Sequence, residues 1–227
     1  MSTRTLPKKN DLTYGLLTKQ DIPQVRDKVI EEFLVREPWL VEWKDQIQWE
    51  TEPGVKELIE FIAREAVQEN LSILAKDDQT GDIAGFRIAI MEKKGAPTWI
   101  DASQAFGLSE VVKQCLGFHA YREELMKDEL QYEKYNITEM GHGLLVNVSP
   151  KFEGKKICQR MISMTNDLMK QRGVRIMKSS TGNPAMVHVY QKNGYEKIYE
   201  FPYKNYLIDG VPPVPKDDLW SVWIKKL

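Results

Sequence analysis

The spacing of apolar residues along the chain predicts strands and helices that alternate from one end to the other. Residues 13–17 form a short apolar strand, and over residues 22–33 the apolar positions recur at helical spacing. This helix must end before Pro38, because the residue that precedes a proline is pushed out of the helical region. Pro53 can begin a second helix, which carries one apolar face over residues 55–66.

A long inserted segment separates the early strands from the later ones. Residues 71–75 and 83–91 have the composition of two strands, joined by a polar turn with the sequence DDQTGD. The segment from Gly95 to Tyr135 then consists of a loop up to Gly107 and a long, charged, roughly helical stretch. We expect this segment to be an insertion between strands of one sheet.

The second half of the chain continues the same alternation. It has an apolar strand at 144–148, a helix at 155–171, a strand at 174–178, a short helix at 184–192, and strands at 195–201 and 219–226. No internal repeat or low-complexity tract divides the sequence. The pattern therefore favours one α/β domain over residues 1–227 rather than two domains.

Composition and charge limit the classes of function. The chain has 227 residues, of which 42% are hydrophobic and 29% charged, and this is enough to bury a substantial core. Its formal net charge of −1 gives no overall basic field of the kind that attracts nucleic acid. No apolar run approaches the ~18 residues of a membrane-spanning helix, and no secretory signal begins the sequence. We therefore expect a cytoplasmic protein with no nucleic-acid or membrane partner.

The cysteines and histidines indicate neither a disulfide framework nor a metal site. Cys115 and Cys158 are too few for a disulfide scaffold, and they fit a reduced, intracellular setting. His119, His142 and His188 have no spacing typical of metal ligands, so structural or surface roles are expected for them. The sequence thus predicts chemistry that needs no metal.

The segment from Gly143 to Arg160, GLLVNVSPKFEGKKICQR, combines a strand, a short basic turn and the start of a helix. Pro150 ends the strand, because proline cannot donate to the ladder of a sheet. The first turn of the next helix leaves backbone N–H groups without internal partners, and together with the helix dipole they form an anion site. From these residues alone two interpretations stay open: a cradle for a pyrophosphate, or an ordinary connection with solvated lysines.

Four segments together resemble one family of enzymes. The strand, turn and helix look like the acetyl-CoA-binding motif of the GNAT acetyltransferases, and residues 183–198 (NPAMVHVYQKNGYEKI) resemble the next GNAT motif. Residues 18–39 are similar to the entry helix and Glu-Pro loop of the invertebrate-type arylalkylamine (dopamine-like) N-acetyltransferases. Residues 201–227 resemble the C-terminal tail of that branch. The resemblance therefore covers nearly the whole chain.

The resemblance implies a fold and a place for acetyl-CoA. The fold would be a single-domain GNAT fold, with a central mixed, splayed β-sheet flanked by helices and open at the strand that ends near residue 148. The backbone of that strand would pair with the pantetheine arm, and the turn would hold the pyrophosphate. The cofactor-binding residues implied in this way are Val146, Asn147, Val148, Glu153, Gly154, Lys155, Lys156, Ile157, Cys158 and Asn183, the last of which can also simply cap its helix.

The turn departs from the family pattern at three positions. Glu153 stands where a basic residue or glutamine is usual, and its charge repels a pyrophosphate. Lys156 and Cys158 stand where small residues are usual, so their side chains are expected to crowd a close backbone approach. Backbone N–H donors survive these substitutions, and Lys156 adds a cation. We expect cofactor binding to be weakened but retained.

Acetyl transfer to an amine requires a base, because an alkylamine with a pKa near ~10 is mostly protonated at neutral pH. Glu37, at the helix-breaking Glu-Pro step, matches the catalytic glutamate of the family by position. Tyr190 stands where many GNAT enzymes carry a tyrosine that protonates the leaving thiolate, although a packing role is an equal alternative. Ser179 and Ser180 can line the cleft near the thioester or serve only as strand-end hydroxyls.

The sequence thus predicts an N-acetyltransferase that uses acetyl-CoA as co-substrate and acts on a primary amine, an arylalkylamine, by direct attack with Glu37 relaying the proton. Trp39, Trp43 and Trp49 can form a wall for an aromatic amine or belong to the core. Two alternatives remain: another amine, such as a polyamine or a protein amine, and a non-catalytic acyl-CoA-binding protein with this altered turn. A monomer or weak dimer is expected.

Overall fold

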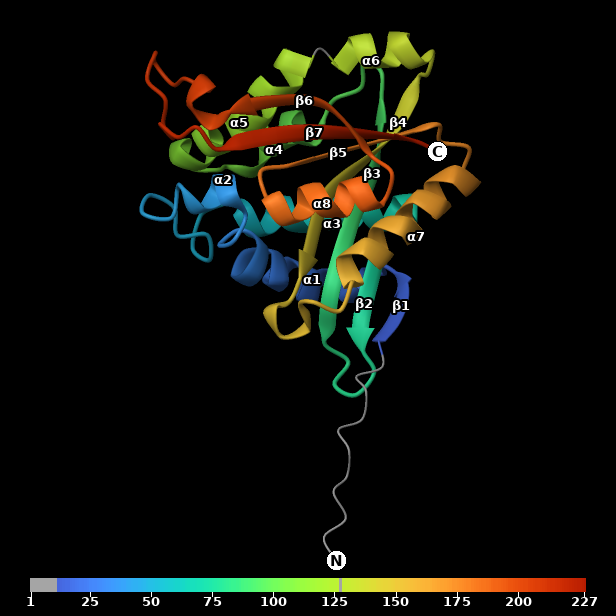
Figure 1. Cartoon of the computed structure of the whole chain (residues 1–227). Coiled ribbons are helices and arrows are strands. Elements are labelled where there is room, and N and C mark those ends of the chain that lie inside the picture. The colour runs from blue at the N-terminus through green and yellow to red at the C-terminus, as the bar shows by residue number, and fades with distance from the viewer. Residues whose placement is uncertain (1–11, 127) are drawn as a thin grey trace, which may run out of the picture.

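The computed structural model describes residues 12–126 and 128–227 and contains one seven-stranded mixed sheet (Figure 1). The strand order is β1-β2-β3-β4-β5-β7-β6, in which β4 and β5 are parallel and all other neighbours are antiparallel. The strands are β1 (Leu12–Leu16), β2 (Ile73–Asp77), β3 (Ile83–Lys93), β4 (Glu139–Val148), β5 (Ile176–Thr181), β6 (Glu196–Pro202) and β7 (Leu219–Lys226).

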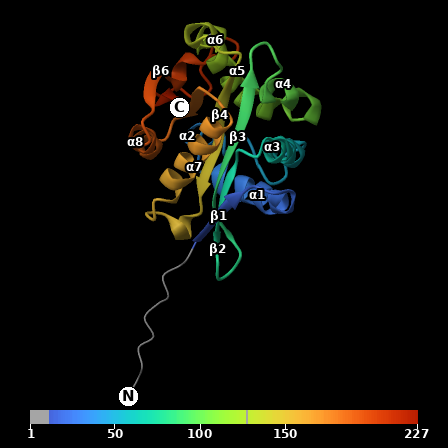
Figure 2. The ribbon, with the colours of Figure 1, turned by 90° about the vertical axis from the view of Figure 1, so that its right-hand side faces the viewer.

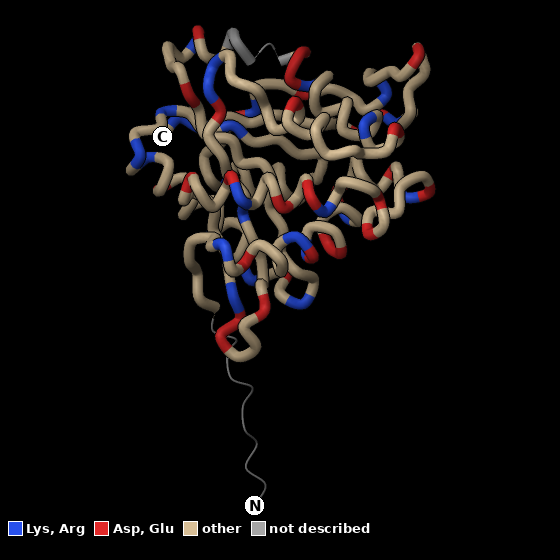
Figure 3. The backbone as a smooth tube through the Cα atoms, turned by 180° about the vertical axis from the view of Figure 1, so that it is seen from behind, with Lys and Arg blue, Asp and Glu red and all other residues tan. Residues whose placement is uncertain are grey.

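Helices cover both faces of the sheet. α7 and α8 lie against one face, whereas α1, α3 and α4 lie on the other (Figure 2). The helices are α1 (Ile22–Lys28), α2 (Pro38–Val41), α3 (Val55–Glu69), α4 (Trp99–Ser103), α5 (Glu110–Met126), α6 (Asp128–Tyr135), α7 (Ile157–Gln171) and α8 (Pro184–Lys192). This arrangement confirms the single α/β domain with a central mixed sheet. Charged residues of both signs are interspersed along the backbone, in keeping with the net charge of −1 (Figure 3).

Most predicted elements are present, and the differences have local causes. The first helix continues into a π-helical turn at Val29–Phe33, and the loop predicted before Gly107 contains α4. β4 begins at Glu139 rather than at 144. The sequence analysis missed its first half, EMGHG, because these residues lack the apolar alternation of a strand. Gly141 shows the reason: a Cβ there would lie 2.7 Å from the sulfur of Met177, so this part of the strand packs through its backbone.

The parallel strands β4 and β5 part almost at once. They pair only over Gly141–Met177, His142–Lys178 and Gly143–Ser179. Beyond this point β4 remains paired with β3, and β5 remains paired with β7. A register shift between Ile88 and Ala89 of β3 lies beside the point of separation. The splayed sheet predicted from the sequence is therefore confirmed, and it opens after Gly143, earlier than expected.

The tryptophan-rich connection contributes mainly to the core. Trp39 is fully buried and stacks on Phe118 of α5, with ring centroids 3.9 Å apart, and its Nε1 donates to the carbonyl of Cys115 at 3.0 Å. Trp43 is 2% exposed and meets Trp39 edge-on. Of the three tryptophans considered for a substrate wall, only Trp49 borders the cavity described below.

Candidate active site

A cavity of about 600 Å³ begins where β4 and β5 part and extends to both faces of the sheet. On one side it is bordered by Glu37 and by Trp49, Trp99 and Trp220. On the other side it is bordered by the turn before α7 and by α8. The free edge of β4 after Gly143 joins the two halves. One continuous space therefore connects the predicted base with the predicted phosphate cradle.

The cradle consists of backbone donors. In the described part of the chain, none of the N–H groups of residues 154–159 donates a hydrogen bond to a protein acceptor. Three of these residues are the first three of α7, whose dipole places its positive end here. Lys155, Lys156 and Lys192 border the same end of the cavity. The donor set suits a phosphate-bearing group, so the residues present fit acetyl-CoA.

The irregular Lys156 occupies a position that favours glycine. It is the N-cap residue of α7 and has a φ of 60° and a ψ of 19°, in the left-handed region. A side chain in this region clashes with the following carbonyl, which explains why a glycine is usual at this place. Gly154, two residues earlier, has a φ of 76° and is the other residue of the turn in the left-handed region.

The strain at Lys156 predicts an unusual gain of stability. We expect Lys156→Gly to raise the free energy of unfolding by roughly 1 kcal/mol, because the relief of about 1–2 kcal/mol exceeds the entropic cost of about 0.4–1 kcal/mol for a new glycine. Urea unfolding would measure it. Lys155→Gly is the matched control: Lys155 has no positive φ, so this change should lower stability. Equal losses in both variants would contradict the interpretation.

The irregular Glu153 is neutralised by a cation from a distant segment. Arg36, in the loop before α2, forms an ion pair through Nη2 with Glu153 Oε1. Its Nη1 also donates to the carbonyl of Val148 at 3.3 Å. The glutamate is therefore not an isolated negative charge beside the cradle. The Val148 carbonyl, predicted to face the pantetheine arm, already accepts a hydrogen bond from Arg36.

The third irregular residue, Cys158, packs towards α8. Its Sγ lies 3.5 Å from the sulfur of Met186, and it borders the cavity. Burial raises the pKa of the thiol to about 11, although the nearby Arg87 acts in the opposite direction. Cys158 is therefore a neutral thiol at physiological pH.

The end of β4 is anchored to the first helical segment. Asn147 Nδ2 and Ser149 Oγ both donate to Glu32 Oε2, each at 2.8 Å, and Lys28 pairs with the other oxygen at 2.7 Å. Burial opposes the ionised form of Glu32, but these three partners outweigh it and lower its pKa. The side chain of Asn147 is thus engaged on the α1 side, and within the described part of the chain no strand pairs with Val146–Val148 on the side of β5.

Glu37 is held as the N-cap of a short helix. Its backbone is extended, and its Oε2 accepts a hydrogen bond from the N–H of Leu40 at 3.1 Å. The backbone N–H groups of Arg36 and Glu37 both donate to the carbonyl of Phe33, which fixes the loop. Burial raises the pKa of Glu37 to about 7, although the N–H groups of Leu40 and Trp39 and the charge of Arg122 act in the opposite direction. A carboxylate with such a pKa is matched to proton transfer near neutrality.

Of the remaining predicted site residues, Ser180, Asn183 and Tyr190 border the same cavity, whereas Ser179 does not. Ser179 is fully buried inside β5 and accepts a hydrogen bond from Arg87 at 2.6 Å, whereas Ser180 accepts one from Arg122 at 2.7 Å. Both are interior residues of β5, not strand-end residues as predicted, because the strand runs on to Thr181. Asn183 caps α8 by accepting the N–H of Ala185. Tyr190 is 1% exposed, and its ring packs between those of Tyr195 and Trp223.

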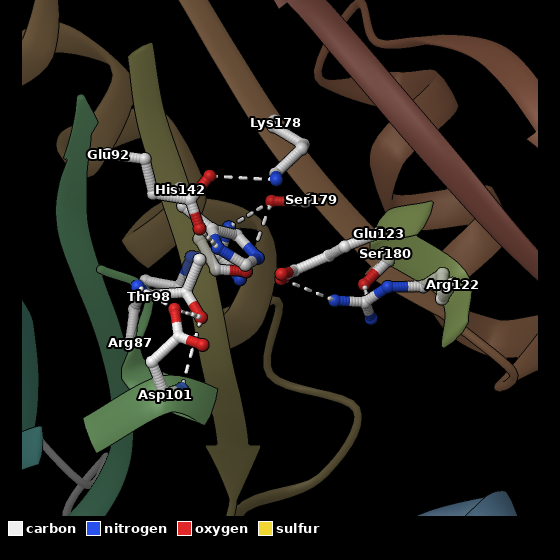
Figure 4. A network of polar contacts seen from close by, with 11 residues as sticks. Arg87, Glu92, Thr98, Asp101, Arg122, Glu123, His142, Lys178, Ser179 and Ser180 are labelled. Atoms are coloured by element: carbon white, nitrogen blue, oxygen red, sulfur yellow. Dashed lines mark hydrogen bonds and ion pairs between the residues drawn. The ribbon is translucent and has the colours of Figure 1, made fainter. Parts of the chain in front are cut away.

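Several buried polar residues of this site were missed by the sequence analysis. Glu92 of β3 bonds His142 Nδ1, and its other oxygen pairs with Lys178 at 2.7 Å (Figure 4). Burial alone would raise the pKa of Glu92, but His142 and Lys178 together hold it far below its usual value. Burial, helped by Lys178, lowers the pKa of His142 despite Glu92. The three side chains tie β3, β4 and β5 together beside the point of separation.

A second group of polar residues comes from α5. Arg122 is 2% exposed, and its Nη2 lies 3.7 Å from a carboxylate oxygen of Glu123. His119 borders the cavity, and no described residue forms a hydrogen bond with its Nδ1. Burial and the charge of Arg122 lower the pKa of His119 well below its ordinary value. The sequence signals a buried polar residue of this kind only where a charge interrupts an apolar run, as Arg87 does in IAGFRIAI. Such a signal marks a buried charge but does not identify its partner.

Comparison with known proteins supports the fold. No protein-family model and no curated protein sequence matches the chain. The structure of arylalkylamine N-acetyltransferase 2 from Aedes aegypti matches with a TM-score of 0.79 and 17% identity, over 96% of this chain and 99% of that one. The polyamine N-acetyltransferase of Drosophila melanogaster, which forms N-acetylagmatine, matches at 0.78 and 15%, over 96% and 100%. The C-terminal condensation domain of Ebony, solved with β-alanyl-dopamine, matches at 0.76 and 13%, over 96% and 100%.

These matches show that the chain has the GNAT fold. The resemblance to the insect arylalkylamine N-acetyltransferases, predicted from four segments, is thereby confirmed at the level of the fold. Within the described residues, no helix is long and apolar enough to cross a membrane, and no cluster of potential ligands is arranged to hold a metal ion.

Proposed function

We propose that this protein is an N-acetyltransferase that transfers the acetyl group of acetyl-CoA to a primary amine. The observation that carries this proposal is one continuous cavity, which joins Glu37 to the N–H groups of residues 154–159 through the gap between β4 and β5. These N–H groups donate to no acceptor among residues 12–126 and 128–227. The reaction needs a base that accepts the proton of the amine and a site that binds the phosphates of the donor, and the two ends of the cavity offer these.

The donor would enter from the α7 side. The N–H groups of the turn and the first turn of α7 would hold its pyrophosphate. An open basic groove next to the turn is bordered by Lys156, Arg160, Lys192 and Lys225, which suits further phosphate charge. The free edge of β4 would orient the pantetheine arm towards the point where the strands part. Acetyl-CoA supplies the activated thioester there.

The amine would enter from the opposite face. Glu37 accepts a proton from the ammonium or from the attacking nitrogen, directly or through water. With a pKa raised to about 7, it can both take up this proton and release it to solvent near neutral pH. Holding the two reactants in one cavity supplies a further part of the rate by orientation. Ser180, fixed by Arg122, borders the same space and is a candidate to orient the reacting groups.

The lining of the cavity favours an aromatic amine. Trp49, Trp99 and Trp220 border its amine end. Among the described lining residues, the only carboxylates are Glu37 and Glu153, and Glu153 is paired with Arg36. A polyamine carries further ammonium groups that call for additional carboxylates, whereas an arylalkylamine carries only the reacting one. We therefore propose an arylalkylamine as the substrate class.

An amine panel with acetyl-CoA, read by thiol release, tests this function, and calorimetry tests the donor site independently. We expect acetyl-CoA to bind and arylalkylamines to be acetylated faster than agmatine and spermidine. No binding at near-millimolar acetyl-CoA would overturn the enzyme proposal. Binding without turnover of any amine would indicate a non-catalytic acyl-CoA-binding protein, and faster turnover of polyamines would overturn the substrate class.

The Arg36–Glu153 pair predicts that donor affinity can be improved. We expect Glu153→Gln to lower the dissociation constant of coenzyme A by about 3- to 10-fold, because it removes a negative charge near the phosphates and leaves Arg36 free to meet them. Calorimetry at low and high salt would measure this, and the gain should shrink with salt. Glu57→Gln, an exposed change on α3, is the matched control. Weaker binding by Glu153→Gln would show that the pair itself shapes the cradle.

A further inference from the structure

A buried cation lies at the point where β4 and β5 part, and the proposed function gives it no role. Arg87, in the middle of β3, is 1% exposed and borders the cavity. Its Nη2 donates to Ser179 Oγ at 2.6 Å, and none of the described residues forms a hydrogen bond with its Nε. Across residues 12–126 and 128–227, no carboxylate forms an ion pair with it.

Its situation differs from that of the two other buried cations near the site. Lys178 is paired with Glu92 at 2.7 Å, and Arg122 lies 3.7 Å from Glu123. A guanidinium that is removed from water without a counter-charge is costly to the fold. An anion that enters the cavity would offset this cost, and the unpartnered Nε is a hydrogen-bond donor available for it.

Neighbouring acidic groups do not supply the missing charge. Burial raises the pKa of Cys158 to about 11 and that of Tyr195 to about 12, even though Arg87 acts on both in the opposite direction. Both side chains are therefore neutral near physiological pH. Since no described residue supplies this charge, a bound molecule is the natural source of an anion for Arg87.

The backbone makes room for this guanidinium at the end of the strand pairing. A Cβ at Gly143 would lie 1.5 Å from Arg87 Nη2 and 2.4 Å from Ser179 Oγ. Gly143 and Ser179 are also the last paired residues of β4 and β5. The charge thus occupies the space of the missing side chain, at the place where the gap between the strands begins.

We propose that Arg87 binds the thiolate of coenzyme A that acyl transfer releases; this proposal rests on the proposed function. In that step the lone pair of the amine forms a C–N bond with the thioester carbonyl carbon. The C–S bond breaks, its electron pair goes to sulfur, and the proton lost by nitrogen goes to Glu37. The negative charge on sulfur is then balanced by Arg87, which Ser179 positions. A proton from Tyr190 is not required for the sulfur to leave.

The proposal predicts that the thiol of bound coenzyme A ionises more readily than the thiol of free coenzyme A. We would measure binding of coenzyme A and of desulfo-coenzyme A, which lacks the sulfur, by calorimetry between about pH 6 and pH 9. Difference absorbance in the ultraviolet would report the thiolate directly. In the wild-type protein, the affinity for coenzyme A relative to desulfo-coenzyme A should rise about 10-fold or more as pH increases. A 10-fold rise requires a thiol pKa at least one unit lower in the complex than in free coenzyme A.

Variants of Arg87 separate this role from packing. Arg87→Gln should abolish the pH-dependent difference between the two ligands while both still bind through the cradle, and Arg87→Lys should restore part of it. Circular dichroism would verify that each variant folds. If neither does, the comparison of the two ligands on the wild-type protein still decides the question.

Three outcomes would overturn the proposal. Identical pH dependence for the two ligands in the wild-type protein would show that no thiolate is stabilised. Retention of the full thiolate signal in folded Arg87→Gln would show that a group other than Arg87 stabilises the thiolate. The third outcome is that succinyl-CoA binds more tightly than acetyl-CoA, that Arg87→Gln abolishes this preference, and that the thiol pKa of bound coenzyme A is not shifted. Arg87 would then bind a carboxylate of the acyl group instead of the thiolate. Failure of the wild-type protein to bind coenzyme A at all would instead overturn the proposed function.

Discussion

Replacement of Glu37 by glutamine is expected to lower kcat/KM for acetyl transfer by about 10²- to 10⁴-fold, the usual contribution of a general base. Glutamine keeps an acceptor oxygen for the N–H of Leu40, so the cap of α2 and the loop before it should persist. The loss would then report the missing proton acceptor. Steady-state kinetics with the best amine of the panel would measure it, and Glu31→Gln, an exposed change in the preceding π-helical turn, is the matched control.

The pH dependence of kcat gives the sharper test of this role. The base acts when ionised, and burial raises the pKa of Glu37 to about 7, so kcat should rise with pH through a midpoint near 7. In Glu37→Gln this midpoint should disappear, and the remaining activity should rise only with the fraction of neutral amine. A variant that keeps both the rate and the midpoint of the wild type would eliminate Glu37 as the base.

The same shift predicts a change in stability that does not depend on activity. Because the pKa of Glu37 is raised on folding, the folded state binds its proton more tightly than the unfolded state does. The contribution of Glu37 to stability is therefore lost as pH rises through the window from about 4.5 to 7. Glu37→Gln should lack this loss, so its unfolding free energy relative to the wild type should increase over that window in urea titrations.

Replacement of Trp39 by alanine is expected to lower the free energy of unfolding by about 3–5 kcal/mol, the range for a large aromatic side chain removed from a core. Trp39 is fully buried and stacks on Phe118, and its neighbours include Tyr203 and Tyr206 from the C-terminal region. The cavity left behind would separate α2 from α5. Because α2 directly follows Glu37, a loss of activity should accompany the loss of stability.

Two matched variants separate packing from hydrogen bonding at this position. Trp39→Phe keeps the aromatic contact but removes the hydrogen bond from the indole Nε1 to the carbonyl of Cys115, so about 0.5–1.5 kcal/mol should be lost. Val35→Ala removes a half-exposed side chain near by and should change stability by less than about 0.5 kcal/mol. Chemical unfolding would measure all three. A loss below about 1 kcal/mol in Trp39→Ala would contradict its assignment to the core.

Several features of the fold were readable from the sequence because they arise from neighbouring residues. Proline at 38 limited the first helix, and the apolar spacing over 184–192 and 219–226 gave α8 and β7 with the observed bounds. The strand, turn and helix around Pro150 were also local patterns. The first half of β4 was not readable, because Gly141 and Gly143 carry no pattern and are small only to admit Met177 and Arg87.

The composition of the candidate site was less predictable than its location. The turn at 153–158 looked unfavourable for a phosphate because Glu153 and Lys156 were judged by type alone. The structure pairs Glu153 with Arg36 across 117 positions and places Lys156 in the left-handed conformation that its position requires. No periodicity in the sequence links residues so far apart. Their charges balance only when the loop before α2 meets the end of β4.

The sequence by itself determined a single α/β domain, the positions of most helices and strands, and a glutamate beside a helix-breaking proline. These depend on backbone preferences and apolar spacing, which act over a few residues. Only the tertiary structure decided that Glu37 has a pKa of about 7, and that Arg87 bonds Ser179 across 92 positions. Desolvation and charge pairing depend on every element packed around a group, so they exist only in the assembled fold.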